Sequence, residues 1–191
     1  MSRGNLFIIS GPSGSGKTTL HKKLLASKRL KGTLVKSISI TTRPIRAGEK
    51  NGRDYLFVSL KKFLYKVKAG HFLEWQKVFE NYYGTPKKNV EGLLRLGRNV
   101  LLCIDVKGAQ VVAQQYPTAV RIFIKAPTFS LLKERLISRG SETQNDLKLR
   151  LETARKELLE AKKYDYIVIN DDLTDAFKKL EAIIIQKIKK N

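Results

Sequence analysis

The stretch LFIISGPSGSGKTTL, residues 6–20, decides the fold of this chain. The apolar run Leu6–Ser10 predicts a buried strand, and the glycine-rich segment Gly11–Gly16 follows it. Apolar residues then recur at helical spacing. The segment GPSGSGKTT, residues 11–19, matches the phosphate-loop (P-loop) pattern G-x-x-x-x-G-K-[ST], with the strand before and the helix after that the motif requires. The stretch therefore predicts a nucleoside triphosphate site.

The spacing of this motif has a chemical reason. Glycines let successive backbone N–H groups converge on phosphate oxygens, and the N-terminus of the following helix adds its positive dipole end. We expect Lys17 to reach the β- and γ-phosphates and the Thr18 hydroxyl to bind Mg²⁺. The predicted triphosphate-binding residues are Gly11, Pro12, Ser13, Gly14, Ser15, Gly16, Lys17, Thr18 and Thr19.

Further apolar strands alternate with amphipathic helices along the rest of the chain. The strands are predicted at Val35–Ile40, Val100–Ile104, Val120–Ile124 and Tyr166–Ile169. Strands that are apolar throughout favour a parallel sheet covered on both faces, so we predict a three-layer α/β fold. The alternation fails in residues 41–89 and 138–150, which are predicted to be functional lobes or mobile lids.

Length and composition limit the classes of protein to which the chain could belong. The chain has 191 residues, enough for one domain with small inserted lobes, and no apolar run approaches the length of a membrane span. The N-terminal residues lack the apolar central stretch of a secretory signal, and the single cysteine, Cys103, fits a reducing compartment, so we expect a cytoplasmic protein. The net charge of +21 could indicate a polyanionic partner, but the basic residues are spread along the chain, so nucleic acid is not the expected partner.

Asp105 bears on the type of reaction. The run VLLCIDVKGA, residues 100–109, is an apolar strand that ends in Asp105, in the form of the P-loop carboxylate that supports Mg²⁺. Val106 follows, where an ATPase often has a glutamate that activates water, and this favours a transferase. The alternative is that Asp105 only caps the helix expected at residues 107–115.

The acceptor site is predicted in the irregular region. Arg43 and Arg46 lie three residues apart and are followed by Tyr55, and such a set suits a monophosphate because guanidinium groups bind its oxygens bidentately. Glu74 follows in FLEW. A carboxylate can accept hydrogen bonds from N1–H and the exocyclic amine of guanine together, whereas adenine offers no matching pair of donors.

An ordered series of motifs resembles the guanylate kinase family. The series comprises GPSGSGKTT, S-x-S-x-TTR-x-x-R-x-GE-x-x-GRDY-x-F, FLE…YYGT, IDVKGAQ, RL-x-x-RG and YDYIVIND, and it runs from about Leu6 to the C-terminal helix. The resemblance implies transfer of the γ-phosphoryl group of ATP to GMP, with Mg²⁺ as cofactor of ATP. It also implies core segments at 1–36, 90–128 and 155–191, a GMP-binding lobe at 37–89 and a lid at 129–154.

The resemblance extends to individual residues. It implies GMP binding by Ser39, Arg43, Arg46, Tyr55, Glu74, Tyr83, Thr85 and Asp105, and metal binding by Thr18 and Asp105. It implies that Lys17, Arg135, Arg139 and Arg150 act on the transferring group, and that Asn170 contacts the adenine side of ATP. The chain departs from the family at Cys103, where an aspartate is common, so that position serves either the metal and GMP or only packing.

Three rival functions remain open from sequence. One is a kinase for another nucleoside monophosphate, against which Glu74 and the TTR-x-x-R run weigh. Another is a kinase-like scaffold that has lost catalysis, although Gly16, Lys17 and Thr18 are intact here. The third is an ATPase stimulated by nucleic acid, which only the charge suggests.

Overall fold

A parallel sheet forms the centre of the molecule. The computed structural model describes residues 3–78, 80–138 and 144–189. The strand order of this sheet is β2-β7-β1-β8-β9, and every neighbouring pair is parallel. Its strands are β1 (Leu6–Ser10), β2 (Leu34–Lys36), β7 (Asn99–Cys103), β8 (Val120–Lys125) and β9 (Tyr166–Ile169). The predicted α/β fold with a central parallel sheet is confirmed.

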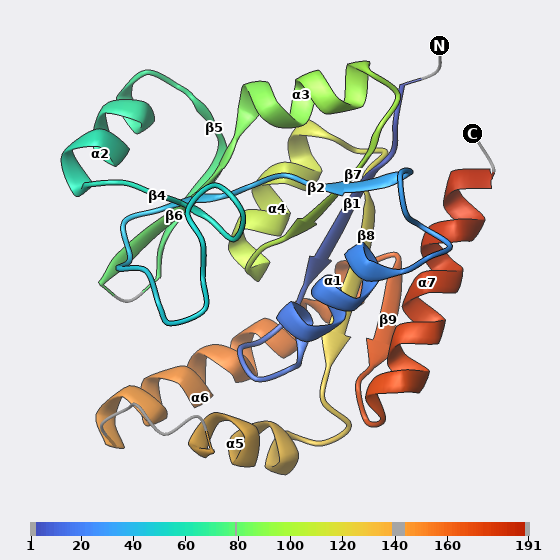
Figure 1. Cartoon of the computed structure of the whole chain (residues 1–191). Helices are drawn as coiled ribbons and strands as arrows, with labels where there is room; N and C mark the ends of the chain where they lie inside the picture. Colours follow the sequence, from blue (N-terminus) through green and yellow to red (C-terminus); the bar gives the residue numbers. More distant parts are fainter. Residues whose placement is uncertain (1–2, 79, 139–143, 190–191) are drawn as a thin grey trace.

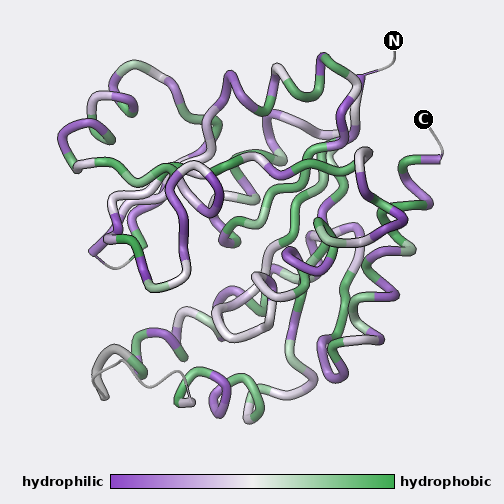
Figure 2. Tube along the Cα trace, viewed as in Figure 1, coloured by the Kyte–Doolittle hydropathy of each residue, from purple (hydrophilic) through white to green (hydrophobic). Residues whose placement is uncertain are grey.

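Helices cover both faces of this sheet (Figure 1). They are α1 (Lys17–Ala26) and α7 (Leu173–Lys189) on one face, and α3 (Lys87–Arg95) and α4 (Val106–Gln115) on the other. Side chains alternate across a strand, so Phe7 and Ile9 of β1 pack toward α1 and α7, while Leu6 and Ile8 pack toward α3 and α4. The sheet therefore lies inside the hydrophobic core, as the green central strands of Figure 2 show.

A second, mixed sheet forms the lobe between β2 and α3. Its order is β4-β3-β6-β5, and its strands are β3 (Ile40–Thr41), β4 (Leu56–Phe57), β5 (Phe72–Val78) and β6 (Asn81–Pro86). The single strand predicted at Val35–Ile40 is wrong. The chain leaves the central sheet after Lys36 and joins the lobe sheet at Ile40, because residues 37–39 cross from one sheet to the other.

The lobe also contains α2 (Leu60–Lys68), which the sequence did not predict. Ser59 caps its N-terminus by accepting a hydrogen bond from the Lys62 backbone N–H. Phe63 is fully buried and stacks on Phe72 of β5, with ring centroids 4.6 Å apart. This aromatic contact fixes α2 to the lobe sheet.

Two further helices follow β8 and lie below the P-loop in Figure 1. They are α5 (Phe129–Ile137) and α6 (Gln144–Leu159), and α6 continues into the 3-10 helix η1 (Glu160–Lys163). Leu132 of α5 and Ala154 of α6 pack in one apolar cluster with Ala126. None of the helices within the described ranges has the length and apolar composition needed to cross a membrane.

Candidate active site

The P-loop lies between β1 and α1, as the sequence predicts. Gly11, Gly14 and Gly16 have φ angles of 139°, 84° and 91°, a region that favours glycine. At Gly11 a β-carbon would lie 2.1 Å from the carbonyl oxygen of Ile124, so no other residue fits there. The Lys17 ammonium folds over the loop and donates to the carbonyls of Gly11 (2.6 Å) and Pro12 (2.8 Å). The glycine conformations and the Lys17 contacts together define the shape of the loop.

The end of β7 lies beside the P-loop. The parallel register pairs Ile9 with Cys103, which sets that thiol next to the point where the loop begins. Burial raises the pKa of the Cys103 thiol, and the nearby Lys17 charge opposes this rise. The thiol therefore stays protonated at neutral pH.

Asp105 caps α4. Its Oδ1 accepts a hydrogen bond of 2.7 Å from the Gly108 backbone N–H, so Asp105 does cap the helix, and its role toward the metal stays a prediction. Thr18 is exposed in the first turn of α1, at the same edge of the sheet. A hydroxyl and a carboxylate are hard oxygen donors, and Mg²⁺ in nucleotide enzymes takes few protein ligands in addition to phosphates and water. The donor set fits Mg²⁺, and the described residues contain no denser cluster of metal-binding side chains.

Glu74 of β5 and Thr85 of β6 form a buried polar pair in the lobe. The Thr85 hydroxyl donates to Glu74 Oε1 at 2.6 Å, and both residues are buried. Burial raises the pKa of Glu74 to about 7, the Asp105 charge acts in the same direction, and the bond from Thr85 opposes it. Glu74 Oε2 lies over the first turn of α4, 2.7 Å from the position of a β-carbon on Gly108. The predicted guanine contacts therefore face the carboxyl end of β7.

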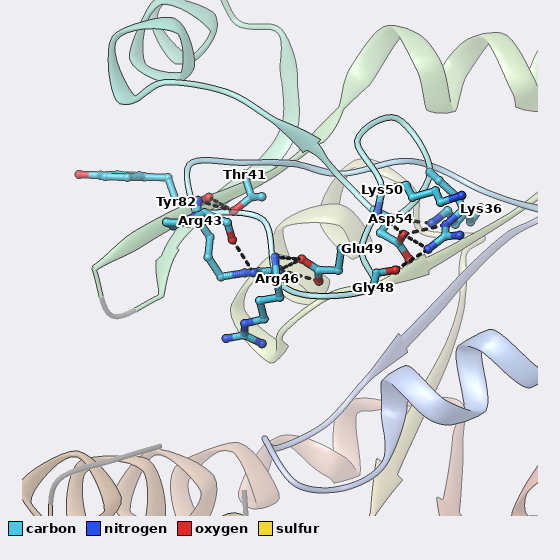
Figure 3. Close-up of polar contacts among 11 residues, drawn as sticks. Lys36, Thr41, Arg43, Arg46, Gly48, Glu49, Lys50, Asp54 and Tyr82 are labelled. Carbon is cyan, nitrogen blue, oxygen red and sulfur yellow. Dashed lines mark hydrogen bonds and ion pairs between the residues drawn. The ribbon is translucent and has the colours of Figure 1, made fainter. Parts of the chain in front are cut away.

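The predicted phosphate clamp contains an internal ion pair (Figure 3). The Arg43 side chain is only 8% exposed, and its guanidinium donates to both oxygens of Glu49, at 2.7 and 2.9 Å. Burial disfavours the charge of Glu49, but the hydrogen bonds from Arg43 and the Arg46 backbone N–H outweigh it and hold the Glu49 pKa below its usual value. Arg46 itself is exposed, and its guanidinium points away from Glu49. Sequence reasoning missed Glu49 as the partner of Arg43.

Aromatic residues complete this side of the site. The rings of Tyr55 and Tyr83 meet edge to face with centroids 6.0 Å apart, and Arg43 Cζ lies 5.7 Å from the Tyr55 ring centre. Burial raises the Tyr55 pKa to about 12, and Cys103 and Tyr83 add to the rise. Ser39 is half-buried in the link between the sheets, and its carbonyl accepts from the Leu56 N–H at 2.9 Å. The structure thus brings Arg43, Tyr55 and Tyr83 together, while Ser39 lies in the segment that links the central sheet to the lobe.

The residues predicted on the ATP side have their own contacts. Arg135 Nη1 donates to the backbone carbonyl of Asn170 at 3.0 Å, and the Asn170 amide donates to the Ser15 carbonyl at 2.8 Å. Arg150 is half-buried on α6. Arg139 lies outside the described residues. The roles of these residues toward ATP stay predictions.

One acidic residue was missed altogether. Glu157 of α6 is half-buried and within electrostatic range of Lys17 and Asp105. Burial raises its pKa to about 7, the Lys17 charge lowers it, and the Asp105 charge raises it. A signal was available, because Glu157 follows the buried Ala154 by three residues and precedes the partly buried Leu158. That spacing places it on the edge of the apolar face of the helix.

Comparison with known proteins decides the family. The family model described as guanylate kinase matches residues 3–187. The chain belongs to the guanylate kinase family. Its similarity to a guanylate kinase of Syntrophomonas wolfei is 46% identity over 96% of this chain and 92% of that protein. For the protein of Thermotoga maritima the identity is 43%, over 95% and 86%.

A solved structure agrees. The crystal structure of guanylate kinase from Anaplasma phagocytophilum superposes with a TM-score of 0.80 at 34% identity, covering 97% of this chain and 87% of that one. The reaction of the family is phosphoryl transfer from ATP to GMP, so the chain is an ATP:GMP phosphotransferase.

Proposed function

We propose that the chain binds the ATP phosphates on residues 11–19 and GMP in the lobe of residues 37–89, and that it transfers the γ-phosphoryl group between them in line. The observation that carries this arrangement is the position of Asp105. Its Oδ1 lies 3.5 Å from the β-carbon position of Gly108, and Glu74 Oε2 of the lobe lies 2.7 Å from the same point. Cys103, two residues before Asp105, pairs with Ile9, which directly precedes the last strand residue before the P-loop. The proposed acceptor and donor sites therefore converge on one point at the carboxyl end of β7.

In the lobe, Glu74 would accept the two guanine N–H groups in its ionised form, with Thr85 holding its Oε1. Arg43, Arg46, Tyr55 and Tyr83 would bind the GMP phosphate. Because Glu49 already neutralises Arg43, GMP binding requires the phosphate to share or replace that partner. Arg46, which is exposed, would then make the first contact.

On the donor side, Lys17 would exchange its loop carbonyls for the β- and γ-phosphates. Arg135, Arg139 and Arg150 would neutralise charge on the migrating group, which is the main requirement of phosphoryl transfer. Thr18 and Asp105 would hold Mg²⁺, and the bound ion would neutralise phosphate charge. No general base is needed in this scheme beyond the oxygens of the acceptor phosphate.

The segments at 37–89 and 129–154 would move toward the core when both nucleotides bind and would exclude water from the transferring group. Two structural details refine this proposal. Helix α3 begins at Lys87 and packs on the central sheet through Val90 and Leu94, so the moving lobe would end near Pro86. Leu132 and Leu136 of α5 lie 3.2 Å from the β-carbon position of Gly14, so α5 would stay with the P-loop while the rest of the 129–154 segment moves.

We also propose a cytoplasmic location, because a chain with a single cysteine cannot form an internal disulfide and fits a reducing compartment.

A coupled assay of ADP formation tests the substrate assignment. Purified protein with ATP and Mg²⁺ is given GMP, AMP, UMP or dTMP, or no acceptor. We expect turnover with GMP and little with the others. Equal ADP formation without an acceptor would indicate an ATPase, and preference for another monophosphate would contradict the acceptor site.

A further inference from the structure

Asn170 is buried directly behind the P-loop. It follows β9 and extends the sheet pairing, because its backbone N–H donates to the Lys125 carbonyl at 2.8 Å. The residue is 5% exposed, and its side-chain Nδ2 donates to the carbonyl of Ser15 at 2.8 Å. The same nitrogen lies 2.1 Å from the position that a β-carbon on Gly16 would take. The amide therefore fills the space where a side chain at residue 16 would stand.

This hydrogen bond sets the direction of a P-loop donor. The Ser15 carbonyl and the Gly16 N–H belong to one planar trans peptide unit, so they point in opposite directions. Asn170 holds the carbonyl from behind the loop. The Gly16 N–H is consequently aimed away from Asn170, toward the side on which the phosphates are proposed to bind.

Helix α5 holds Asn170 in turn. Arg135 Nη1 donates to the Asn170 carbonyl at 3.0 Å. On either side of Arg135, Leu132 and Leu136 approach a β-carbon position on Gly14 to 3.2 Å. The loop is thus supported at two glycines, directly by α5 at Gly14 and through Asn170 at Gly16.

We propose that Asn170 is a positioning residue for the phosphate loop, and that it acts on the triphosphate through Ser15 and Gly16 instead of binding adenine. This inference rests on the proposed placement of the ATP phosphates on residues 11–19. It differs from an adenine contact in one measurable respect. A contact to the base affects only ligands that carry a base, whereas a displaced phosphate loop affects every ligand with the polyphosphate.

The test compares ATP with inorganic tripolyphosphate. Dissociation constants of both are measured at fixed Mg²⁺ by displacement of a fluorescent ATP analogue, well below the melting temperature of each protein. Asn170→Ala removes the donor that holds the Ser15 carbonyl, and reorienting the freed peptide on binding should cost about tenfold in affinity, the size of one hydrogen bond. We expect ATP and tripolyphosphate to weaken by the same factor, and GMP binding to stay unchanged. Asp171→Asn, next along the chain and exposed, is the matched control and should alter neither affinity.

Asn170→Asp provides a second, nearly isosteric variant. It replaces the donor with a carboxylate oxygen facing the Ser15 carbonyl, so it should weaken both ligands more than alanine does. Weakening of ATP with unchanged tripolyphosphate affinity would assign Asn170 to the adenine side and overturn the proposal. Unchanged affinity for both would also overturn it. Lys17→Ala tests separately the assumption that the ATP phosphates bind on residues 11–19. If this variant binds tripolyphosphate as well as the wild type does, the proposed placement of the phosphates is wrong.

Discussion

Glu74 and Gly108 are in close contact across two segments of the chain: Glu74 Oε2 lies 2.7 Å from the point where a β-carbon on Gly108 would stand. The lobe sheet and the first turn of α4 can approach this closely because residue 108 has no side chain. The same turn receives the cap from Asp105. A substitution at Gly108 should therefore affect GMP binding, although residue 108 is not itself proposed to contact GMP.

Gly108→Ala should weaken GMP binding. The added methyl group would push the Glu74 carboxylate away, and displacements of this size at a site can cost ten- to a hundredfold in efficiency, roughly. We expect KM for GMP to rise at least about tenfold while KM for ATP stays near wild type. Gly92→Ala is the matched control, because it is also a helical glycine and has nothing within 4 Å of its β-carbon position. Equal effects of the two substitutions would show that helix propensity, not contact with Glu74, is responsible.

Glu74→Gln should weaken GMP binding in a pH-dependent way. The amide replaces one acceptor oxygen with a donor, at a cost of about 1–3 kcal/mol, or about one to two decades in affinity. Because the Glu74 pKa is about 7, the free protein holds it partly protonated at neutral pH, and GMP needs the ionised form. The ratio of wild-type to variant affinity should thus increase between pH 6 and 8. Titration of the GMP phosphate cancels in this ratio, and a flat ratio would remove Glu74 ionisation from the binding step.

His21 should make the protein sensitive to acid. Burial lowers its pKa from 6.5 to about 4, and the charges of Lys36 and Lys22 add to this. Between these two pKa values the unfolded chain binds the proton and the native protein does not, so stability is lost as pH falls from 6.5 toward 4. The loss is on the order of 3 kcal/mol, from 1.36 kcal/mol per pKa unit.

Urea unfolding at pH 7 and pH 4.5 measures that loss. His21→Gln cannot titrate and should reduce the difference in unfolding free energy between the two pH values. His71→Gln, at the other histidine of the chain, controls for the replacement of a histidine by glutamine as such. A His21→Gln protein with the full wild-type acid sensitivity would contradict the prediction.

Cys103→Asp should hold or raise kinase activity and lower the Mg²⁺ concentration needed. The thiol lies close enough to Lys17 to interact with its charge, so a new carboxylate would have a cationic partner. A packing role predicts the opposite, because an unpaired buried carboxylate destabilises a fold by several kcal/mol, roughly. Activity against Mg²⁺ concentration, together with melting temperature, distinguishes the two. Cys103→Ser serves as the uncharged control.

The central fold could be predicted because its signals are local. The strand, P-loop and helix of residues 6–26 follow one another in sequence. The short apolar runs of β7, β8 and β9 are each typical of a buried strand. The crossing at residues 37–39 could not be predicted in this way. The run VKSISI, residues 35–40, is rich in β-branched residues and is typical of one strand, and this composition is the same whether the chain stays in one sheet or changes to another.

In the site, the residue types were easier to predict than their partners. The arginines, tyrosines and Glu74 stand in recognisable motifs, but the pairing of Arg43 with Glu49 depends on how the loop between them folds back. The approach of Glu157 to Lys17 depends on the packing of α6 against the core. The two residues are 140 positions apart, so the local spacing that marks Glu157 as partly buried does not predict its partner. The environment of a charge, and therefore its pKa, required the tertiary structure.

Because Cys103 is the one cysteine of the chain, the carboxyl end of β7 can be labelled selectively through its thiol. The thiol lies at the end of β7, paired with Ile9 near the start of the P-loop, and within electrostatic range of Lys17 and of Tyr55 of the lobe. Alkylation by iodoacetamide would modify this single atom and no other thiol. Its rate at fixed pH would report, in the unmodified native sequence, how often the end of β7 becomes accessible to a small reagent.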